Sequence, residues 1–391
     1  MKRIVSPSVA LSLASPVPKD PGFANALIAW QKQHGRHQLP WQQTRDAYRI
    51  WLSEIMLQQT QVATVIPYYA RFLERFPDVA ALATAPVEEV MAHWSGLGYY
   101  TRARNLHCCA QQIVEHHAGK FPPDPDTLAS LPGIGKSTAA AIAAFAYGAR
   151  AAIMDGNVKR VFCRVFGVEG FPGQAAVEKH LWQRAGALLP SRDIEAYTQG
   201  LMDLGATVCT RTRPACERCP MRARCIAHAA GRTAELPARK PKKTIPEKST
   251  IMLIVVHDGD ILMEQRPARG IWGGLLSLPE LNRLATGEVD ADLPAQLALA
   301  LSSFGEIESV QPLAVFVHGF THYRLSVAPV QVGLRERHRM AAQSDYQWRA
   351  LADISAAALP SPVRKLLATL NNTLLKKVAG FEGESGSKVA K

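Results

Sequence analysis

Four cysteines crowd into one short window of this 391-residue chain, and they constrain its fold more than any other feature. The spacing C-x6-C-x2-C-x5-C separates Cys209, Cys216, Cys219 and Cys225. Four thiolates in so compact a loop either bind metal or repel one another. One C-x2-C pair flanked by two single cysteines is more typical of a [4Fe-4S] cluster than of structural zinc, which usually has two such pairs. We therefore expect a [4Fe-4S] cluster, with zinc as the alternative.

Basic residues surround these cysteines, and only one acid, Glu217, lies among them. The five cations are Arg211, Arg213, Arg218, Arg222 and Arg224. They either compensate the negative charge of a cluster or present cations to phosphates, and the two interpretations are compatible. The whole chain has 45 Lys and Arg against 33 Asp and Glu, a formal charge of +12, which favours an anionic partner such as nucleic acid.

Hydrophobic periodicity divides the chain into two domains. Residues 23–230 have helical periodicity and no convincing alternating strand, so we expect an all-α domain. Residues 231–249 contain three prolines and a cluster of Lys and Arg, which is the composition of a basic linker. Residues 250–376 predict a second domain. The flanking segments 1–22 and 377–391 are expected to be disordered.

The second domain mixes strand and helix patterns. Residues 251–266 form two β-rich runs joined by Asp-Gly-Asp, and residues 315–332 predict another strand pair. Residues 293–301 and 362–377 have helical patterns. The domain is therefore expected to be α+β.

No segment approaches the roughly 20 apolar residues that a membrane-spanning helix needs, so no membrane partner is expected. The remaining cysteines, Cys108, Cys109 and Cys163, lie in helix-like contexts typical of buried, reduced thiols. Without a disulfide framework, the chain fits a reducing compartment, and we expect an intracellular, cytoplasmic protein.

A glycine-containing turn lies between two helical segments at Leu131-Pro132-Gly133-Ile134-Gly135. Such a turn can expose backbone N–H groups at the start of the next helix and hold a phosphate without a side-chain charge. The alternative is a plain corner between two helices.

Two carboxylates are candidate catalytic groups. Glu54 lies one helical turn from Ile50 and Leu57, within an apolar stripe, so its pKa should be raised and it could act as a general acid or base. Asp155 is followed by Gly156 and begins a new helix. Taken alone, Asp155 is best interpreted as an N-cap.

Together these motifs resemble the endonuclease III superfamily of helix-hairpin-helix DNA glycosylases, and within it the adenine glycosylases of the MutY type. The resemblance covers residues 23–370 approximately. It rests on the LPGIG hairpin, the cysteine spacing and the segments WLSEIMLQQTQVATVIPYY, WSGLGYYTRARNLH, MDGNVKRV, GIWGGLLSLPE and GFTHYRLSVAP.

The resemblance implies a multidomain protein, in which an all-α helix-hairpin-helix glycosylase domain with an iron-sulfur loop precedes an α+β Nudix-like domain. The implied activity is hydrolysis of the N-glycosidic bond of adenine mispaired with 8-oxoguanine or guanine in double-stranded DNA. The adenine must first leave the base stack. A monomer that acts on the nucleoid and initiates base excision repair is expected.

The resemblance also implies roles for individual residues. Glu54 matches the general acid, which protonates the adenine and also activates water. Asp155 matches the carboxylate that stabilises the oxocarbenium-like sugar, and Asn157 would support its charge. DNA contacts are implied for the hairpin positions Leu131, Gly133, Gly135 and Ser137.

Recognition of the mispair is implied for two further groups of residues. Gln59 and Tyr99 match side chains that the family inserts beside the oxidised guanine, although Tyr99 would otherwise be read as a core aromatic. The loop Phe320-Thr321-His322 matches the 8-oxoguanine recognition loop, with Thr321 in place of the usual Ser. No Nudix box is present, so pyrophosphate hydrolysis is not expected.

Two rival functions are weighed against this one. In the bifunctional glycosylase/lyases of the superfamily, a nucleophilic Lys occupies the position of Ser137, so Ser137 indicates a monofunctional enzyme, although the adjacent Lys136 permits slow lyase chemistry. A non-enzymatic mismatch-binding protein would have no need for both Glu54 and Asp155.

Overall fold

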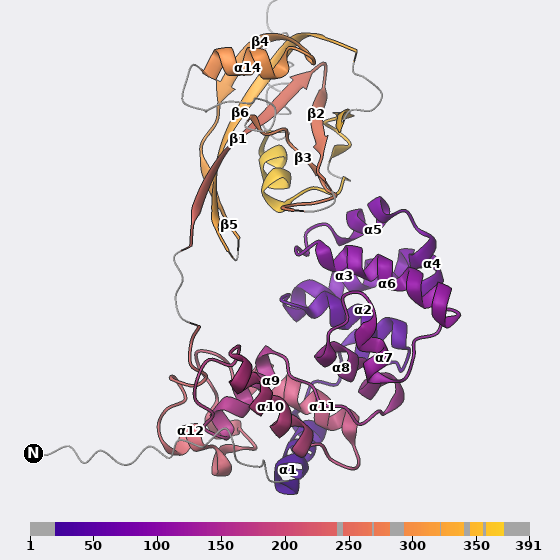
Figure 1. Ribbon diagram of the computed structural model, residues 1–391, viewed down its shortest axis with the longest axis vertical. Coiled ribbons are helices and arrows are strands. Elements are labelled where there is room, and N and C mark those ends of the chain that lie inside the picture. Colours follow the sequence, from indigo (N-terminus) through magenta and orange to yellow (C-terminus); the bar gives the residue numbers. More distant parts are fainter. Residues whose placement is uncertain are drawn as a thin grey trace, which may run out of the picture. The chain divides into compact units, whose positions relative to one another are not determined.

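The computed structural model describes residues 20–240, 245–267, 270–281, 293–320, 322–339, 345–354 and 357–370. The chain divides into two compact units (Figure 1). The first unit joins Met1–Ala85 to Asn105–Lys242, and the second joins Pro86–Arg104 to Lys243–Lys391. Most of the N-terminal extension, the middle of the linker and the whole C-terminal tail that the sequence predicted lie outside the described residues.

The described part of the first unit is helical throughout, as the periodicity predicted. Its elements are α1 (Pro21–His34), η1 (Pro40–Gln42), α2 (Ala47–Leu57), α3 (Val62–Arg75), α4 (Val79–Thr84), the greater part of α6 (Thr101–His117), α7 (Pro125–Ser130), α8 (Lys136–Tyr147), α9 (Gly156–Val165), α10 (Ala175–Ala187), α11 (Ile194–Asp203), the π-turn η2 (Leu204–Val208), η3 (Cys216–Arg218), η4 (Arg222–Arg224) and α12 (Ile226–Ala229).

Helix boundaries in this unit follow local chemistry. Asp46 caps α2 by accepting from the backbone N–H of Tyr48 at 2.9 Å. Gly148, with a φ of 66°, ends α8 in the left-handed conformation that glycine adopts easily. The helical periodicity of residues 23–230 marks no boundary between α2 and α3, but the chain breaks there, where Gln59 has a φ of 58°.

The core of the first unit brings helices from both ends of the unit together. Helix α1 packs against α11, while α2 packs against α8. Phe23 of α1 is fully buried and contacts Phe162 of α9 and Tyr197 of α11 edge-on. This packing positions α2, which carries Glu54, and α9, which Asp155 caps and which carries Asn157.

The second unit contains α5 (Val87–Trp94) and a seven-stranded sheet. Its strands are β1 (Glu247–His257), β2 (Asp260–Gln265), β3 (Leu276–Ser277), β4 (Gly305–Pro312), β5 (Phe316–Gly319), β6 (Arg324–Arg337) and β7 (Tyr346–Ala350). The order is β3-β2-β1-β6-β4, with β5 also pairing with β6 and β7 with β2. Strands β1 and β6 are parallel, and the other pairings are antiparallel.

Helices cover both faces of this sheet. Met252 and Ile254 of β1 pack in the cluster that includes the helix of residues 361–370, drawn in yellow in Figure 1. Leu253 and Val255 point to the other face, where α14 (Leu293–Leu301) packs beside β4. The alternation has the two-residue period of a strand buried on both sides. The second domain is therefore α+β, as predicted.

None of the helices in the described ranges combines the length and the apolar character needed to span a membrane.

Candidate functional site

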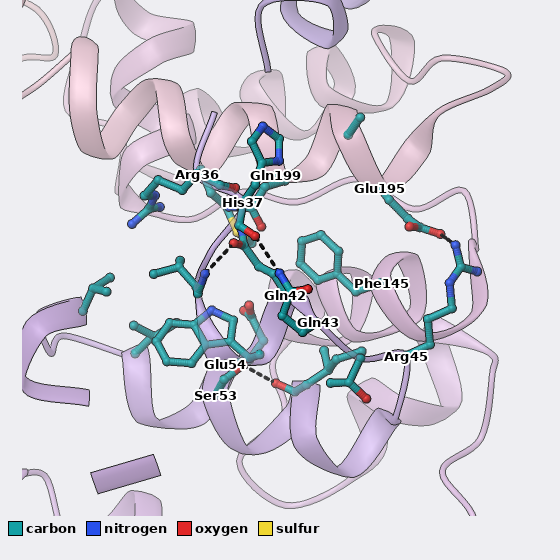
Figure 2. A pocket seen from close by; sticks show the side chains of 18 of the residues that line it. Arg36, His37, Gln42, Gln43, Arg45, Ser53, Glu54, Phe145, Glu195 and Gln199 are labelled. Atoms are coloured by element: carbon teal, nitrogen blue, oxygen red, sulfur yellow. Dashed lines mark hydrogen bonds and ion pairs between the residues drawn. The ribbon is translucent and has the colours of Figure 1, made fainter. Parts of the chain in front are cut away.

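A cavity of about 660 Å³ in the first unit is lined by α2, α8, α11 and the loop after α1 (Figure 2). Its volume falls within the range of roughly 300–1,000 Å³ that is typical of sites for small molecules. Apolar and polar side chains share the lining. They include Arg36, His37, Leu39, Trp41, Gln42, Gln43, Ile50, Glu54, Leu57, Phe145, Gln199 and Met202.

Glu54 contributes a carboxyl group from α2 to this cavity (Figure 2). Ile50 and Leu57, four residues before and three after it, line the same cavity, so the apolar stripe predicted from the sequence surrounds the carboxyl. Burial, and secondly the charge of Asp155, raises the pKa of Glu54 from 4.5 to about 8. At pH 7 Glu54 therefore holds a proton that it can donate.

Asp155 is the N-cap of α9, as its sequence context predicted. Its Oδ1 accepts from the backbone N–H of Val158 at 2.8 Å, and its Oδ2 accepts from Asn157 Nδ2 at 3.3 Å. Burial raises the pKa of Asp155, while these hydrogen bonds and the charge of Arg160 act in the opposite direction. The environments of Asp155 and Glu54 differ because hydrogen-bond donors contact the carboxylate of Asp155, whereas Ile50 and Leu57 flank Glu54 on the cavity wall.

A hydrogen-bonded chain connects Asp155 to the cysteine loop. Asn157 donates to Asp155 and accepts from Arg160 Nη2 at 2.8 Å. Arg160 also donates to the carbonyls of Gly205 and Cys209, both at 2.7 Å. Glycine is required at position 205, since a Cβ there would lie 2.4 Å from the Cβ of Asn157. The backbone before Cys209 therefore fixes the side chain of Asn157.

The four cysteines of the motif line one enclosed cavity between α9 and the loop of η3 and η4. Cys209 and Cys225 are buried, and Cys216 and Cys219 are partly exposed. Arg164, which is 2% exposed, donates to Cys209 Sγ at 3.3 Å and to the carbonyl of Thr210 at 2.7 Å. In the described ranges, His, Cys, Asp and Glu side chains form no group of three or more that could hold a metal ion.

Two of the interleaved arginines bind acids. Arg222 pairs with Glu217 at 2.6 Å, and Arg224 pairs with Asp20 at 2.7 Å. Arg164 on α9, which donates to a thiol, was not singled out from the sequence.

The hairpin between α7 and α8 has the backbone of a tight turn. Gly133 has a φ of 77°, and a Cβ at this position would lie 2.8 Å from the Cβ of Asn105, so glycine is required. Gly133 and Gly135 are exposed, whereas the side chain of Leu131 is buried. Gly135 is the N-cap of α8, which leaves N–H groups available at the start of this helix.

Ser137 does not cap α8. Its Oγ accepts from the backbone N–H of Met154 at 2.9 Å and thereby fixes the segment that leads into Asp155. The neighbouring Lys136 lies with its ammonium 4.5 Å from the ring centroid of Trp182, a cation–π contact.

Gln59 and Tyr99 share an unusual backbone conformation. Their φ angles are 58° and 51°, in the left-handed region that non-glycine residues seldom occupy. Both residues are exposed, and Tyr99 keeps 47% of its surface accessible. The alternative that Tyr99 is a core aromatic is therefore wrong.

A second cavity, of about 560 Å³, lies within the second unit. Tyr99, Phe320 and His322 line it together with Trp272 and His318. Phe320 meets the His318 ring at 4.7 Å, nearly perpendicular, and stacks on Tyr323, which lies outside this lining. Thr321 lies outside the described residues. Aromatic side chains such as those in this lining can stack on a flat base.

Trp272, which lines the second cavity, lies next to a buried cluster of charged side chains. Trp272 has a φ of 54°, and the guanidinium of Arg266 lies 5.9 Å from its ring. Arg266 donates to Glu280 at 2.8 Å and approaches Glu264 at 3.4 Å, and all three residues are buried. Trp272 and Glu280 lie in the segment GIWGGLLSLPE, which entered the sequence analysis only through the resemblance, and no role was predicted for either residue or for the ionic cluster.

Comparison with known proteins gives matches to both domains. The family model of the HhH-GPD superfamily base excision DNA repair proteins matches residues 52–186, and that of the NUDIX domain matches residues 250–369. These matches confirm the predicted order of a helical helix-hairpin-helix domain and an α+β Nudix domain.

Relatives match over most of the chain. The adenine DNA glycosylase of Buchnera aphidicola subsp. Acyrthosiphon pisum is 32% identical over 359 residues, which cover 90% of this chain and 98% of that protein. The adenine DNA glycosylase of Rattus norvegicus is 35% identical and covers 78% of this chain and 69% of its own. The solved structure of a thermostable thymine-DNA glycosylase is 28% identical, covers 54% of this chain and 96% of its own, and has a TM-score of 0.48.

Proposed function

Because the chain belongs to the adenine DNA glycosylases, which bind DNA and act in base excision repair, we propose a specific reaction for it. A monomeric, monofunctional enzyme hydrolyses the N-glycosidic bond of adenine that is mispaired with 8-oxoguanine or guanine in duplex DNA. One observation carries this proposal. Glu54 borders a cavity large enough for an extruded base, and burial together with the negative charge of Asp155 raises its pKa to about 8.

In this reaction, Glu54 donates its proton to N7 of the adenine. The C1′–N9 bond then breaks, its electron pair leaves with the base, and the sugar becomes an oxocarbenium-like cation. Asp155 stabilises this cation, and a water molecule attacks C1′ while the Glu54 carboxylate accepts its proton. Two carboxyl groups in different environments thus supply the acid and the anion.

Asn157 and Arg160 support Asp155 in this role. The hydrogen bond from Asn157 and the charge of Arg160 favour the ionised form of Asp155, against the effect of burial. Arg160 also bonds two carbonyls of the segment that contains Cys209, so the loop of the cysteines holds it in place.

Ser137 supports the monofunctional assignment. A lyase would need an amine that can attack C1′, but Ser137 has a hydroxyl that accepts from the backbone before Asp155. The amine of Lys136 is held over Trp182.

We propose that Cys209, Cys216, Cys219 and Cys225 hold a [4Fe-4S] cluster. Four thiols that surround one cavity suit such a cluster, because each of its four irons takes one thiolate. Arg164 offsets part of the negative charge through its bond to Cys209 Sγ. When bound, the cluster supplies a rigid cross-link for the loop next to α9, and no step of base removal passes through it.

DNA contacts are proposed for the hairpin and for two exposed residues. The exposed backbone at Gly133 and Gly135 can donate to phosphates, with Ser137 on the first turn of α8. The buried side chain of Leu131 restricts this position to backbone contacts. Gln59 and Tyr99 are proposed to enter the base stack beside the oxidised guanine, because both are exposed and held in unusual conformations.

The second cavity is proposed to recognise 8-oxoguanine. Tyr99, Phe320 and His322 belong to one lining, and aromatic rings can stack on the base. Thr321 would add a hydroxyl that can accept from or donate to the oxidised edge. This role predicts that Phe320→Ala lowers the preference for 8-oxoguanine over guanine opposite adenine.

The test is a duplex that contains one adenine opposite 8-oxoguanine, incubated with the full-length protein and then treated with alkali to cleave abasic sites. We expect cleavage only after alkali, loss of cleavage in Glu54→Gln, and retention in Glu74→Gln, a matched change of an exposed acid on α3. Cleavage without alkali would indicate a lyase. No abasic site at all would exclude the glycosylase activity proposed for this chain.

A further inference from the structure

Asp203, the last residue of α11, has a fully buried side chain. Its Oδ1 accepts from Arg36 Nε at 2.7 Å and from Gln199 Nε2 at 2.8 Å, and its Oδ2 accepts from the backbone N–H of Arg36 at 2.8 Å. Charged groups are buried only where partners satisfy them, and here three donors converge on one carboxylate.

Both donor residues line the cavity of Glu54, whereas Asp203 does not. Any effect of Asp203 on a bound base therefore passes through Arg36 and Gln199. Gly35 allows this approach, because a Cβ at position 35 would lie 3.0 Å from Oδ2 of Asp203 and 2.6 Å from the carbonyl oxygen of Gln31.

Arg36 anchors the loop that supplies one wall of the cavity. The backbone N–H of Arg36 donates to Asp203 Oδ2, and the backbone carbonyl of Arg36 accepts from Gln42 Nε2 at 2.9 Å. Gln42 in turn accepts from the backbone N–H of Leu39 at 3.0 Å, and Leu39 and Gln42 both line the cavity. The position of Arg36 thus determines the position of this wall.

Asp203 also determines which end of the Gln199 amide is available. A carboxylate only accepts, so it can bond only the Nε2 end, and this bond assigns the orientation of the amide. Oε1, an acceptor, is then the end left for a ligand. Adenine carries a donor at C6, its amino group, whereas a 6-oxopurine carries an acceptor there.

We infer that Asp203 is a positioning residue that sets base specificity: by fixing the Gln199 amide, it makes the cavity accept a 6-aminopurine and reject a 6-oxopurine. This inference rests on the proposed function. In Asp203→Asn, the side-chain amide would offer one acceptor oxygen to the three donors. Gln199 could then turn its Nε2 toward the base, and the preference for a 6-aminopurine over a 6-oxopurine would weaken.

The experiment compares single-turnover release of adenine and of hypoxanthine, each opposite 8-oxoguanine, by the full-length protein. In Asp203→Asn, the ratio of the two rates should fall about tenfold, the value of roughly one hydrogen bond. Gln199→Leu should lower the ratio similarly, and the double variant should fall no further. A purely structural role would slow both reactions equally.

Asp193→Asn is the matched control, because Asp193 precedes the same helix and pairs with Lys32 at an exposed site. Its rates and its ratio should stay within about twofold of the parent protein. An unchanged ratio in folded Asp203→Asn would overturn the inference. If that variant does not fold, Gln199→Leu decides, since an unchanged ratio there also overturns it. A parent protein that releases no adenine would instead refute the proposed function.

Discussion

Replacement of Glu54 by Gln should make the protein more stable at neutral pH while it abolishes adenine release. Burial raises the pKa of Glu54 from 4.5 to about 8 in the folded state. Between these two pH values, the unfolded chain ionises at this residue and the folded chain does not. The free energy of unfolding therefore falls as the pH rises from 4.5 to about 8. Below pH 4.5, Glu54 is protonated in both states, so its raised pKa does not lower the free energy of unfolding.

The magnitude follows from the interval in pH. Each pH unit between 4.5 and 7 lowers the free energy of unfolding by about 1.4 kcal/mol, so at pH 7 Glu54 costs about 3 kcal/mol. Gln has nearly the same shape and no charge to lose. The Glu54→Gln variant should recover most of this cost at pH 7 and almost none at pH 4.5.

The assay is urea unfolding of the helical signal at pH 4.5, 6 and 7.5, with Glu74→Gln as the control at an exposed position of α3. We expect the stability gain of Glu54→Gln to grow with pH, while the control stays near zero throughout. An equal gain at all three pH values, or a loss at pH 7.5, would refute the assignment of a raised pKa to Glu54.

Four further outcomes are expected. The single-turnover rate should fall about tenfold per pH unit above pH 8 if Glu54 acts as the proposed acid, and a flat profile would contradict this role. Gly205→Ala should slow base release by about tenfold or more with little change in duplex binding, since the added methyl would displace Asn157, whereas Gly186→Ala, which has open space around it, should have no effect. Borohydride should trap little DNA on the parent protein and more on Ser137→Lys, and efficient trapping by the parent would favour a lyase. Elemental analysis should find about four irons per chain, and stoichiometric zinc would exclude the cluster.

Local patterns predicted the elements that depend on neighbouring residues. The turn Asp258-Gly259 joins β1 and β2 as the hairpin signal predicted, and β5 and β6 form the second strand pair. The break at Gln59 was missed, because no glycine or proline marks it. The parallel pairing of β1 with β6 was also missed, since register between distant strands depends on tertiary packing and not on turn chemistry.

Some residues of the candidate site could likewise be predicted from local sequence patterns, and others could not. Glu54 could be found from the sequence because its apolar neighbours recur with helical spacing, and Asp155 because an acid before glycine is a typical cap. Asp203 could not, since its partner Arg36 is 167 residues away in sequence and the spacing of the two residues has no signature. Only the folded chain brings the three donors to this carboxylate.

The left-handed conformations of Gln59 and Tyr99 lower the stability of the fold. Selection for stability and selection for the proposed repair function should therefore favour different residues at these two positions. Each costs on the order of 1 kcal/mol relative to glycine, which adopts the same backbone freely. A screen for heat resistance alone should therefore enrich glycine at both positions. If Gln59 and Tyr99 enter the base stack as proposed, a screen for low mutation frequency should remove those same variants, because glycine has no side chain to fill the space that an extruded adenine leaves.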